Sequence, residues 1–426
     1  MKRFVCLALT LVLLLVTVGC KGGNAVSENI SAEVSSSALS SAVSSAVSEV
    51  EEELPTSEQI LNGEDPKLYE LAIDNEGNKA RLAALMKKAE KGGSFVIGAI
   101  GGSITQGAGA SGEKRRYVNH VFNWWKENFP KATFTLVNAG IGASNAEMAC
   151  YRLETDLLSH NPDFVIVDFS VNTYLNNDQI GTYQTLLYKI MSQKNSPAVM
   201  SVHFTSTVAA EYEKGGKAVR ANVYPNDQIK AAIKKYDIPS VNYDNYVWTR
   251  IDQRAIRWKN IGADYIHPSD NGHKLAGYMF AAYLSKVKAN LNNESTAIPA
   301  LPKLDTEKYL NLDYVINTVS GATAVGFTKE GNSTPQTRGW KYISGAANAS
   351  LTVPLPKNSN VVLFLNFGDT EGKITLKGAN GATKTLDITV KHNHVLMPFG
   401  AMGNSVTIIP EITKGDFRIL GIGIEK

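Results

Sequence analysis

Between residues 95 and 241 the chain alternates short apolar runs with amphipathic segments. The apolar runs are rich in Val, Ile and Phe and are bounded by Pro, Asp or Asn, which is typical of buried strands. Because helical patterns separate them, we expect a parallel sheet that helices cover on both faces. The predicted strands are Phe95–Ile100, Thr133–Val137, Phe164–Phe169, Ala198–Phe204 and Ile238–Val241.

The segments between and after these runs carry apolar residues at helical spacing. Ser144 and Glu147 have the spacing of a capping box, which predicts a helix that begins at Ser144. Ligands of such sheets bind beyond the carboxyl ends of the strands, so the residues after each strand are the first candidates for a site. The predicted helices are Tyr117–Phe129, Ser144–Leu158, Ile180–Met191, Asp227–Tyr236 and Asn271–Leu291.

The pattern changes beyond Pro299. Strand-like segments follow one another, Gly, Asn or Lys turns separate them, and no helical pattern occurs after about Tyr314. This predicts an antiparallel β-sandwich over residues 300–426, with a domain boundary near residues 295–304. The predicted strands are Asn360–Phe367, Lys373–Lys377, Lys384–Val390, Val395–Phe399, Ser405–Pro410 and Phe417–Ile424.

The pattern of the first 55 residues predicts a targeting signal followed by a flexible tether. Lys2 and Arg3 precede an apolar run as long as the core of a signal peptide and short for a membrane-spanning helix. The run ends in Gly19 and Cys20, so residues 1–19 resemble a bacterial lipoprotein signal whose cysteine becomes lipidated. Plain secretion and a retained anchor helix are the alternatives. Residues 20–55 are rich in Ser and poor in large apolar side chains, which predicts a flexible tether.

The amino-acid composition excludes or disfavours several classes of protein and of binding site. The chain has 426 residues, of which 43% are hydrophobic, and this is ordinary for a globular protein. Lys plus Arg number 43 against 40 Asp plus Glu, a balance that disfavours nucleic acid as a partner. Three cysteines exclude a disulfide scaffold and a thiolate zinc site. Cys150 is the only cysteine outside the first twenty residues, and we expect it to be a buried thiol.

Four short blocks carry the candidate chemistry. Three of them follow the first three predicted strands, and the fourth precedes the last predicted helix. A serine between a glycine and a short turn can present its hydroxyl into a cleft, and a carboxylate three residues before a histidine can bond the imidazole. The blocks are Gly101-Gly102-Ser103, Asn138 to Ser144, Ser170 to Thr173, and Asp264 to His267.

Together these blocks resemble the signature blocks of the SGNH (GDSL) hydrolase superfamily. The resemblance covers roughly residues 77–291. It implies a three-layer α/β/α, flavodoxin-like domain with a five-stranded parallel sheet over residues 56–295, and neither a metal nor another cofactor. It also implies a catalytic triad of Ser103 as nucleophile, His267 as base and Asp264 as its partner. Ester hydrolysis by a serine requires the same groups, because a serine hydroxyl is a poor nucleophile until a neighbouring base accepts its proton.

The resemblance further implies an oxyanion hole made of the Ser103 and Ala143 backbone N–H groups and the Asn172 side chain. The second-block glycine of the family falls on Ala143, with Gly142 and Gly140 as competing positions. A backbone donor needs glycine only where φ is positive, so alanine is acceptable there. Two other departures are Gly102, where the family has aspartate, and Thr173, where the family's third block ends in aspartate. We expect these to adjust the site's support without inactivating it.

Three further residues leave alternatives open. Tyr174 directly follows the third block and either contacts substrate or packs in the wall of the site. Trp340 is either a sugar-stacking residue or part of the sandwich core, and the core is favoured. His273 lies near the start of the last predicted helix, where we expect a capping or exposed side chain.

An extracytoplasmic, lipid-anchored esterase with an accessory β domain suits polysaccharide processing. The resemblance and the location therefore suggest hydrolysis of small acyl esters, acetyl foremost, on glycans such as plant hemicellulose. The expected partners are an acylated polysaccharide or oligosaccharide and the bacterial cell membrane, reached through the lipid on Cys20. The alternatives are a lipid or aryl esterase with the same triad, and a glycan-binding lipoprotein with a decayed site.

Overall fold

The chain divides into two units, residues 1–53 and residues 54–426. The predicted signal peptide, Cys20 and nearly all of the predicted tether lie outside the residues that the structure describes. None of the helices in the described part of the chain combines the length and the apolar character that crossing a membrane requires. The computed structural model describes residues 53–172, 178–205, 227–331, 334–335, 337–356, 359–367, 369–388 and 395–425.

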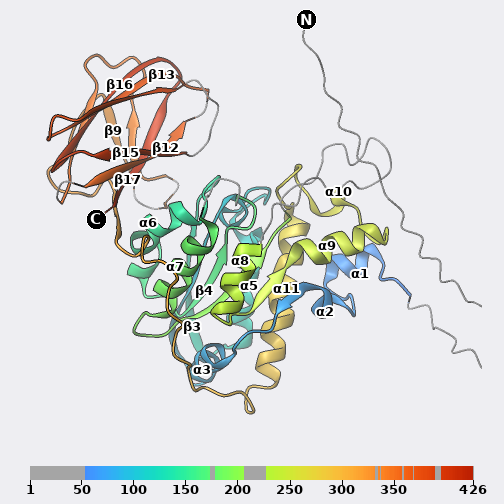
Figure 1. Cartoon of the computed structure of the whole chain (residues 1–426). Coiled ribbons are helices and arrows are strands. Elements are labelled where there is room, and N and C mark those ends of the chain that lie inside the picture. Colours follow the sequence, from blue (N-terminus) through green and yellow to red (C-terminus); the bar gives the residue numbers. More distant parts are fainter. Residues whose placement is uncertain are drawn as a thin grey trace, which may run out of the picture. The chain divides into compact units, whose positions relative to one another are not determined.

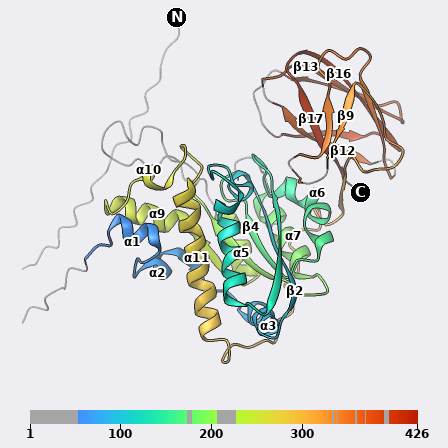
Figure 2. The ribbon, with the colours of Figure 1, turned by 180° about the vertical axis from the view of Figure 1, so that it is seen from behind.

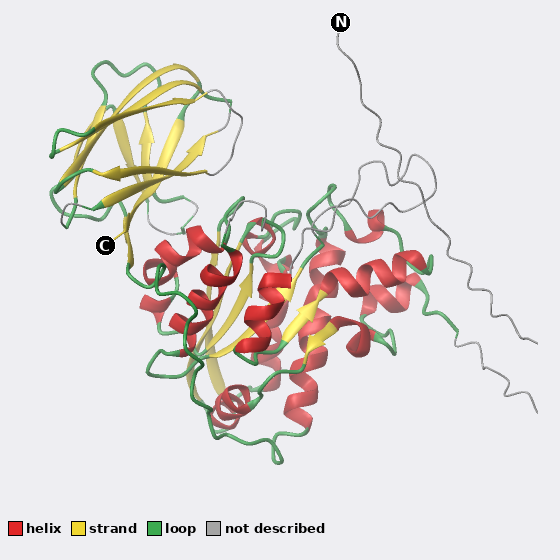
Figure 3. Ribbon diagram, in the orientation of Figure 1, coloured by secondary structure: helices red, strands yellow, loops and turns green. Residues whose placement is uncertain are grey.

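A six-stranded sheet forms the centre of residues 54–289, which we call the α/β region (Figure 3). The strand order is β1-β6-β5-β4-β2-β3, and the last five strands of this order pair in parallel as predicted. The edge strand β1 pairs antiparallel with β6, and its three residues carry too short a pattern to be predicted. The strands are β1 Ile73–Asn75, β2 Gly93–Gly101, β3 Ala132–Gly140, β4 Phe164–Asp168, β5 Ala198–His203 and β6 Ser240–Asn242.

Helices cover both faces of this sheet, so the predicted three-layer α/β/α fold is confirmed (Figures 1 and 2). Successive residues of β4 enter two separate apolar clusters: Ile166 packs with α5 and α11, and Val167 packs with α6 and α7. This alternation follows from the two-residue repeat of a strand. The α-helices are α1 Ser57–Asn62, α2 Leu68–Ala72, α3 Ala80–Ala89, α4 Ser103–Gln106, α5 Tyr117–Asn128, α6 Ala146–Asp156, α7 Gln179–Met191, α8 Asp227–Lys235, α9 Tyr243–Asp252, α10 Trp258–Ile261 and α11 Asp270–Ala289, with 3-10 turns at Glu113–Arg115 and Leu158–His160.

The start of α6 differs from the prediction. The N-cap is Asn145, whose side chain accepts a 2.9 Å hydrogen bond from the Met148 N–H. The Ser144 hydroxyl instead donates to the Ile141 carbonyl at 2.6 Å and also lies 3.1 Å from the Gly101 carbonyl. The predicted capping box at Ser144 is therefore wrong, because asparagine caps a helix as well as serine does and the preceding loop uses the serine hydroxyl.

Residues 312–425 form two antiparallel sheets in their described part, and we call them the β region. One sheet has the order β15-β12-β17-β10-β9 with β7 paired to β17, and the other has the order β14-β13-β16-β11-β8. Trp340 is 2% exposed inside their shared core, so the core interpretation of this residue is confirmed. The strands are β7 Leu312–Val315, β8 Thr323–Val325, β9 Phe327–Glu330, β10 Gly339–Tyr342, β11 Ser350–Pro354, β12 Asn360–Phe367, β13 Glu371–Gly378, β14 Thr383–Ile388, β15 Val395–Ala401, β16 Ser405–Lys414 and β17 Phe417–Glu425.

Helix α6 joins the two regions. Its Tyr151 packs edge-on against Phe364 of β12, with ring centroids 5.6 Å apart, and donates a 2.7 Å hydrogen bond to Glu425 of β17. Tyr314 and Leu420 of the β region belong to the same apolar cluster as the α6 side chains. The β region therefore buries apolar surface directly against the helix that follows the second sequence block.

Candidate active site

Ser103 lies at the turn between β2 and the short helix α4. Strand β2 ends at Gly101, and a Cβ atom there would lie 2.2 Å from the Thr105 hydroxyl and 2.7 Å from the Asp168 carbonyl. Only glycine therefore permits this close approach of the turn to β4. The Gly102 N–H donates to the Asp168 carbonyl at 3.2 Å, which fixes the turn beside the end of β4. The Ser103 hydroxyl consequently lies at the carboxyl edge of the sheet.

The loop between α10 and α11 brings His267 and Asp264 to Ser103. His267 Nε2 lies 2.9 Å from Ser103 Oγ, and His267 Nδ1 lies 2.7 Å from Asp264 Oδ2. The other carboxylate oxygen, Asp264 Oδ1, accepts the backbone N–H groups of Ile266 and His267, both at 2.7 Å. The structure thus assembles the predicted triad residues into one chain of hydrogen bonds.

Asp264 is an anion at neutral pH despite its partial burial. Burial acts to raise its pKa, but the hydrogen bonds from the His267 backbone and ring and from the Ile266 N–H outweigh it and hold the pKa below its usual value. The Trp258 indole donates to the Asp264 carbonyl at 2.6 Å and fixes the loop. A carboxylate in this position holds the imidazole in one tautomer and stabilises its protonated form.

The second block contains three competing backbone donors, and two of them have partners. The Gly142 N–H donates to the Gln106 side chain at 2.6 Å, and the Gly140 N–H donates to the Asn138 side chain at 2.9 Å. The Ala143 N–H donates no hydrogen bond within the described residues. Of the three positions, Ala143 therefore fits best as the backbone donor of the oxyanion hole, the role that the family resemblance implies for it.

The backbone of Ala143 departs from expectation. Its φ is +54°, in the left-handed region that favours glycine. An L-residue pays on the order of 1–2 kcal/mol for this conformation. Alanine therefore occupies this position with a positive φ, and the expectation of an ordinary backbone there is wrong. The loop is closely packed as well, since a Cβ on Gly140 would lie 2.2 Å from the Gln106 nitrogen.

Asn172 follows β4 and faces the second block. Its Nδ2 donates one hydrogen to the Ser144 carbonyl at 3.0 Å, and an amide nitrogen carries two hydrogens. A Cβ on Gly102 would lie 3.0 Å from the same Nδ2, so the glycine that replaces the family's aspartate adjoins this amide. Thr173 and Tyr174 lie outside the described residues, and the role predicted for Tyr174 stays a prediction.

Asp168 is a buried carboxyl group that the sequence analysis missed. It ends β4 and is 3% exposed, and burial raises its pKa to about 7 against the hydrogen bonds from Thr105 and Ser170. The Thr105 hydroxyl donates to Asp168 Oδ2 at 2.9 Å and also lies 2.8 Å from the Tyr117 hydroxyl. An acidic residue inside the apolar run Phe164–Phe169 was the signal that could have found it.

The position of the His273 side chain differs from the prediction. The side chain is fully buried, its Nδ1 accepts the Tyr117 N–H at 3.2 Å, and its Nε2 lies 3.0 Å from the Ala108 carbonyl. Burial lowers its pKa to about 4, so the ring is neutral at neutral pH. The expectation of an exposed or capping histidine is wrong, because the ring bonds α11 to the start of α5 and to the loop after Ser103.

Residues 99–275 match the model of the GDSL-like Lipase/Acylhydrolase family. This segment contains all five described residues of the predicted triad and oxyanion hole. No curated protein sequence matches the chain.

The chain is similar to several solved structures, to different extents. A two-domain esterase (CEX) active on acetylated mannans, co-crystallized with mannopentaose, is 25% identical with a TM-score of 0.65, and the match covers 84% of this chain and 98% of that one. The esterase crystallised without the sugar matches at 24% identity and a TM-score of 0.64 over the same shares. A catalytic mutant of an acetylxylan esterase from Geobacillus stearothermophilus is 16% identical, with a TM-score of 0.36 over 45% of this chain and 94% of that one. The two-domain match covers both the α/β region and the β region.

Proposed function

We propose that this protein is a serine esterase that removes small acyl groups, acetyl foremost, from carbohydrates. The observation that carries the proposal is the chain of hydrogen bonds from Ser103 through His267 to Asp264 at the carboxyl edge of the sheet. In this arrangement the serine hydroxyl has a base at hydrogen-bond distance, and the base has an anionic partner.

The reaction has two steps in this site. Ser103 Oγ attacks the ester carbonyl while His267 Nε2 accepts the serine proton, and the same nitrogen then donates that proton to the departing sugar oxygen, which leaves as a hydroxyl. In the second step a water molecule attacks the acyl-serine as His267 accepts its proton, and Ser103 recovers its proton when the carboxylic acid leaves. Asp264 stabilises the imidazolium that forms in both steps.

Three donors would hold the negative oxygen of each tetrahedral intermediate. They are the backbone N–H groups of Ser103 and Ala143 and the second amide hydrogen of Asn172. The two backbone groups donate no hydrogen bond within the described residues, and the Asn172 amide is oriented by the Ser144 carbonyl. Donors fixed before the reaction stabilise developing charge without having to reorganise.

The substrate class is supported by the two-domain relative. That protein is an esterase active on acetylated mannans, and the match to it extends over both regions of this chain. An acetylated mannan or a related acetylated hemicellulose is therefore the first substrate to test.

The test is an acetate-release assay on acetylated mannan and acetylated xylan, with long-chain p-nitrophenyl esters for comparison. We expect acetate release from at least one polymer, little turnover of long-chain esters, and no release by Ser103→Ala. Preferred turnover of long-chain esters would instead support a lipid or aryl esterase. Glycan binding without any ester turnover would support a decayed site.

We further propose that the protein is anchored outside the cytoplasm through a lipid on Cys20. The support is the sequence: Gly19 and Cys20 close an apolar run, and a polar tract follows. Detergent-phase partitioning of the parent and of Cys20→Ala tests this proposal. We expect only the parent in the detergent phase, and equal partitioning would overturn the anchor.

A further inference from the structure

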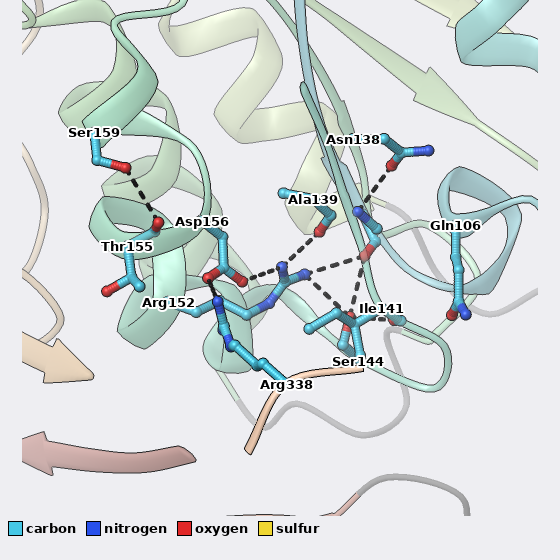
Figure 4. Close-up of polar contacts among 12 residues, drawn as sticks. Gln106, Asn138, Ala139, Ile141, Ser144, Arg152, Thr155, Asp156, Ser159 and Arg338 are labelled. Carbon is cyan, nitrogen blue, oxygen red and sulfur yellow. Dashed lines mark hydrogen bonds and ion pairs between the residues drawn. The ribbon is translucent and has the colours of Figure 1, made fainter. Parts of the chain in front are cut away.

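A buried arginine on α6 ties the first two sequence blocks together (Figure 4). The Arg152 side chain is fully buried, and its Nη1 donates to the Ala139 carbonyl at 2.5 Å. Its Nη2 donates to the Gly101 carbonyl at 3.2 Å and lies 3.4 Å from the Ser144 hydroxyl. One guanidinium thus bonds the end of β2, two residues before Ser103, and both ends of the loop that contains Ala143.

The same contacts reach the third block. The Ser144 hydroxyl lies next to Arg152, and the Ser144 carbonyl orients the Asn172 amide. Ser103 therefore lies two residues after a carbonyl that Arg152 binds, and Ala143 and the Asn172 amide adjoin Ser144, whose hydroxyl Arg152 contacts.

Asp156, one turn further along α6, divides its carboxylate between two arginines. Its Oδ2 accepts from Arg152 Nη1 at 3.1 Å, and its Oδ1 pairs with Nη1 of Arg338. Arg338 comes from the β region, where it immediately precedes β10, and its side chain is 5% exposed. Figure 4 shows Arg152 and Arg338 meeting at the Asp156 carboxylate, with Arg152 also reaching the Ala139 carbonyl.

This sharing limits how Asp156 can act on Arg152. A carboxylate with both oxygens free pairs with a guanidinium through two parallel hydrogen bonds, which is the strongest geometry for this pair. Here Arg338 occupies one oxygen, so Arg152 makes a single bond to Asp156, and its other Nη donors go to the Ala139 and Gly101 carbonyls and to the Ser144 hydroxyl. Without Arg338, both oxygens of Asp156 could turn to Arg152 and compete with the Gly101 and Ala139 carbonyls for its N–H groups.

We propose that Arg338 of the β region is a positioning residue for ester hydrolysis, which acts through Asp156 and Arg152 on the loops that carry the oxyanion donors. The inference rests on the proposed function. It gives the β region a part in the chemical step that does not depend on glycan binding.

The test is the full-length Arg338→Met variant, assayed on a small soluble acetyl ester well below its melting temperature. We expect kcat to fall by about 10- to 100-fold with little change in KM, because displacing catalytic groups by about 1 Å costs roughly this much. The rate at which a fluorophosphonate labels Ser103 should fall as well, since that reaction also develops charge in the oxyanion hole.

Three variants separate positioning from stability. Arg338→Lys keeps a cation for Asp156 and should recover part of the lost kcat. Tyr151→Phe removes the hydrogen bond to Glu425 at the same interface, without touching the loops, and should lower the melting temperature but not kcat. In an Asp156→Asn background, Arg338→Met should lower kcat no further, because the route through the carboxylate is already broken.

The outcomes distinguish this inference from the proposed function. Ester turnover by the parent together with unchanged kcat in folded Arg338→Met would overturn the inference alone. Equal losses in Arg338→Met and Tyr151→Phe would also overturn it, because a general loosening of the interface would then suffice. A parent protein that neither hydrolyses esters nor is labelled at Ser103 would overturn the proposed function and this inference with it.

Discussion

The α/β region and the β region differ in where their strands end. The parallel strands β2, β3 and β4 all end at one edge of their sheet, and the loops after them carry Ser103, Ala143 and Asn172. Antiparallel strands end alternately at opposite edges, so the β region has no single edge at which chemistry can collect. Its described contact with the candidate site is an indirect one, from Arg338 through the buried pair on α6.

The difference teaches that a region can contribute to a site without facing it. The β region covers α6 with apolar side chains and supplies one cation to Asp156, while the groups that would react all come from the α/β region. Removing a reacting group from the α/β region should therefore affect the chemical step, and removing apolar contacts from the β region should affect stability.

The largest expected effect is that of Ser103→Ala. Loss of the nucleophile should reduce kcat by roughly 10³-fold or more, because triad members act as a unit. The side chain is small and lies on a turn, so the melting temperature should stay unchanged. Turnover and fluorophosphonate labelling measure the effect. Retained activity would show that Ser103 is not the nucleophile and that the reaction does not take place at this site of the α/β region.

The next effect is that of Asn172→Ala. Loss of one fixed oxyanion donor typically costs on the order of 10²–10³ in kcat. Asn172→Asp is the matched control, since it keeps the size of the side chain but cannot donate in its ionised form. We expect both variants to bind substrate with similar KM and to turn it over slowly. An active Asn172→Asp would show that the amide hydrogens are not needed.

Much of the α/β region could be predicted from the sequence, because its buried strands are apolar runs separated by helical patterns and the blocks follow them. The β region was harder. Strand β8 has three exposed residues and therefore no apolar alternation, and β7, β9 and β10 have only four residues each. A run this short does not distinguish a strand from a turn.

The support of the site was also beyond the sequence. Arg152 and Asp156 have the i,i+4 spacing of an ordinary surface ion pair on a helix. Nothing in that spacing reveals that both are buried or that Arg338, from a distant part of the chain, shares the carboxylate. The positive φ of Ala143 likewise could not be predicted, because alanine gives no sign of a left-handed backbone.

A third change, Leu376→Ala, tests the β region alone. This β13 side chain is fully buried in the core of that region, and its truncation should lower the free energy of unfolding by about 2–5 kcal/mol. For the molecules that stay folded, kcat should change by less than about twofold, since distant sites act independently. Urea unfolding and turnover measure the two quantities. A large loss of kcat in folded protein would mean that the β region affects the site through other contacts besides that of Arg338.

The last effect concerns pH and Asp168. Its pKa is about 7 in the folded protein, because burial disfavours the charged form, and it lies near 3.8 in a free side chain. The folded state therefore holds a proton that the unfolded state releases between these values. The stability that this proton contributes is complete below about pH 3.8 and is lost as the pH rises towards 7.

Asp168→Asn mimics the protonated form at every pH and isolates this contribution. The free energy of unfolding of the parent, relative to that of Asp168→Asn, should fall with rising pH by at most about 1.4 kcal/mol per pH unit and level off above about pH 7. Urea titrations from pH 4.5 to pH 8.5, a range set by these two pKa values, measure it. Asp65→Asn is the control: Asp65 pairs with Arg250 at 2.7 Å and its pKa is lowered, so its contribution changes only below pH 3.8. A flat difference for Asp168→Asn as well would mean that Asp168 is ionised in the folded protein, beside the turn that carries Ser103.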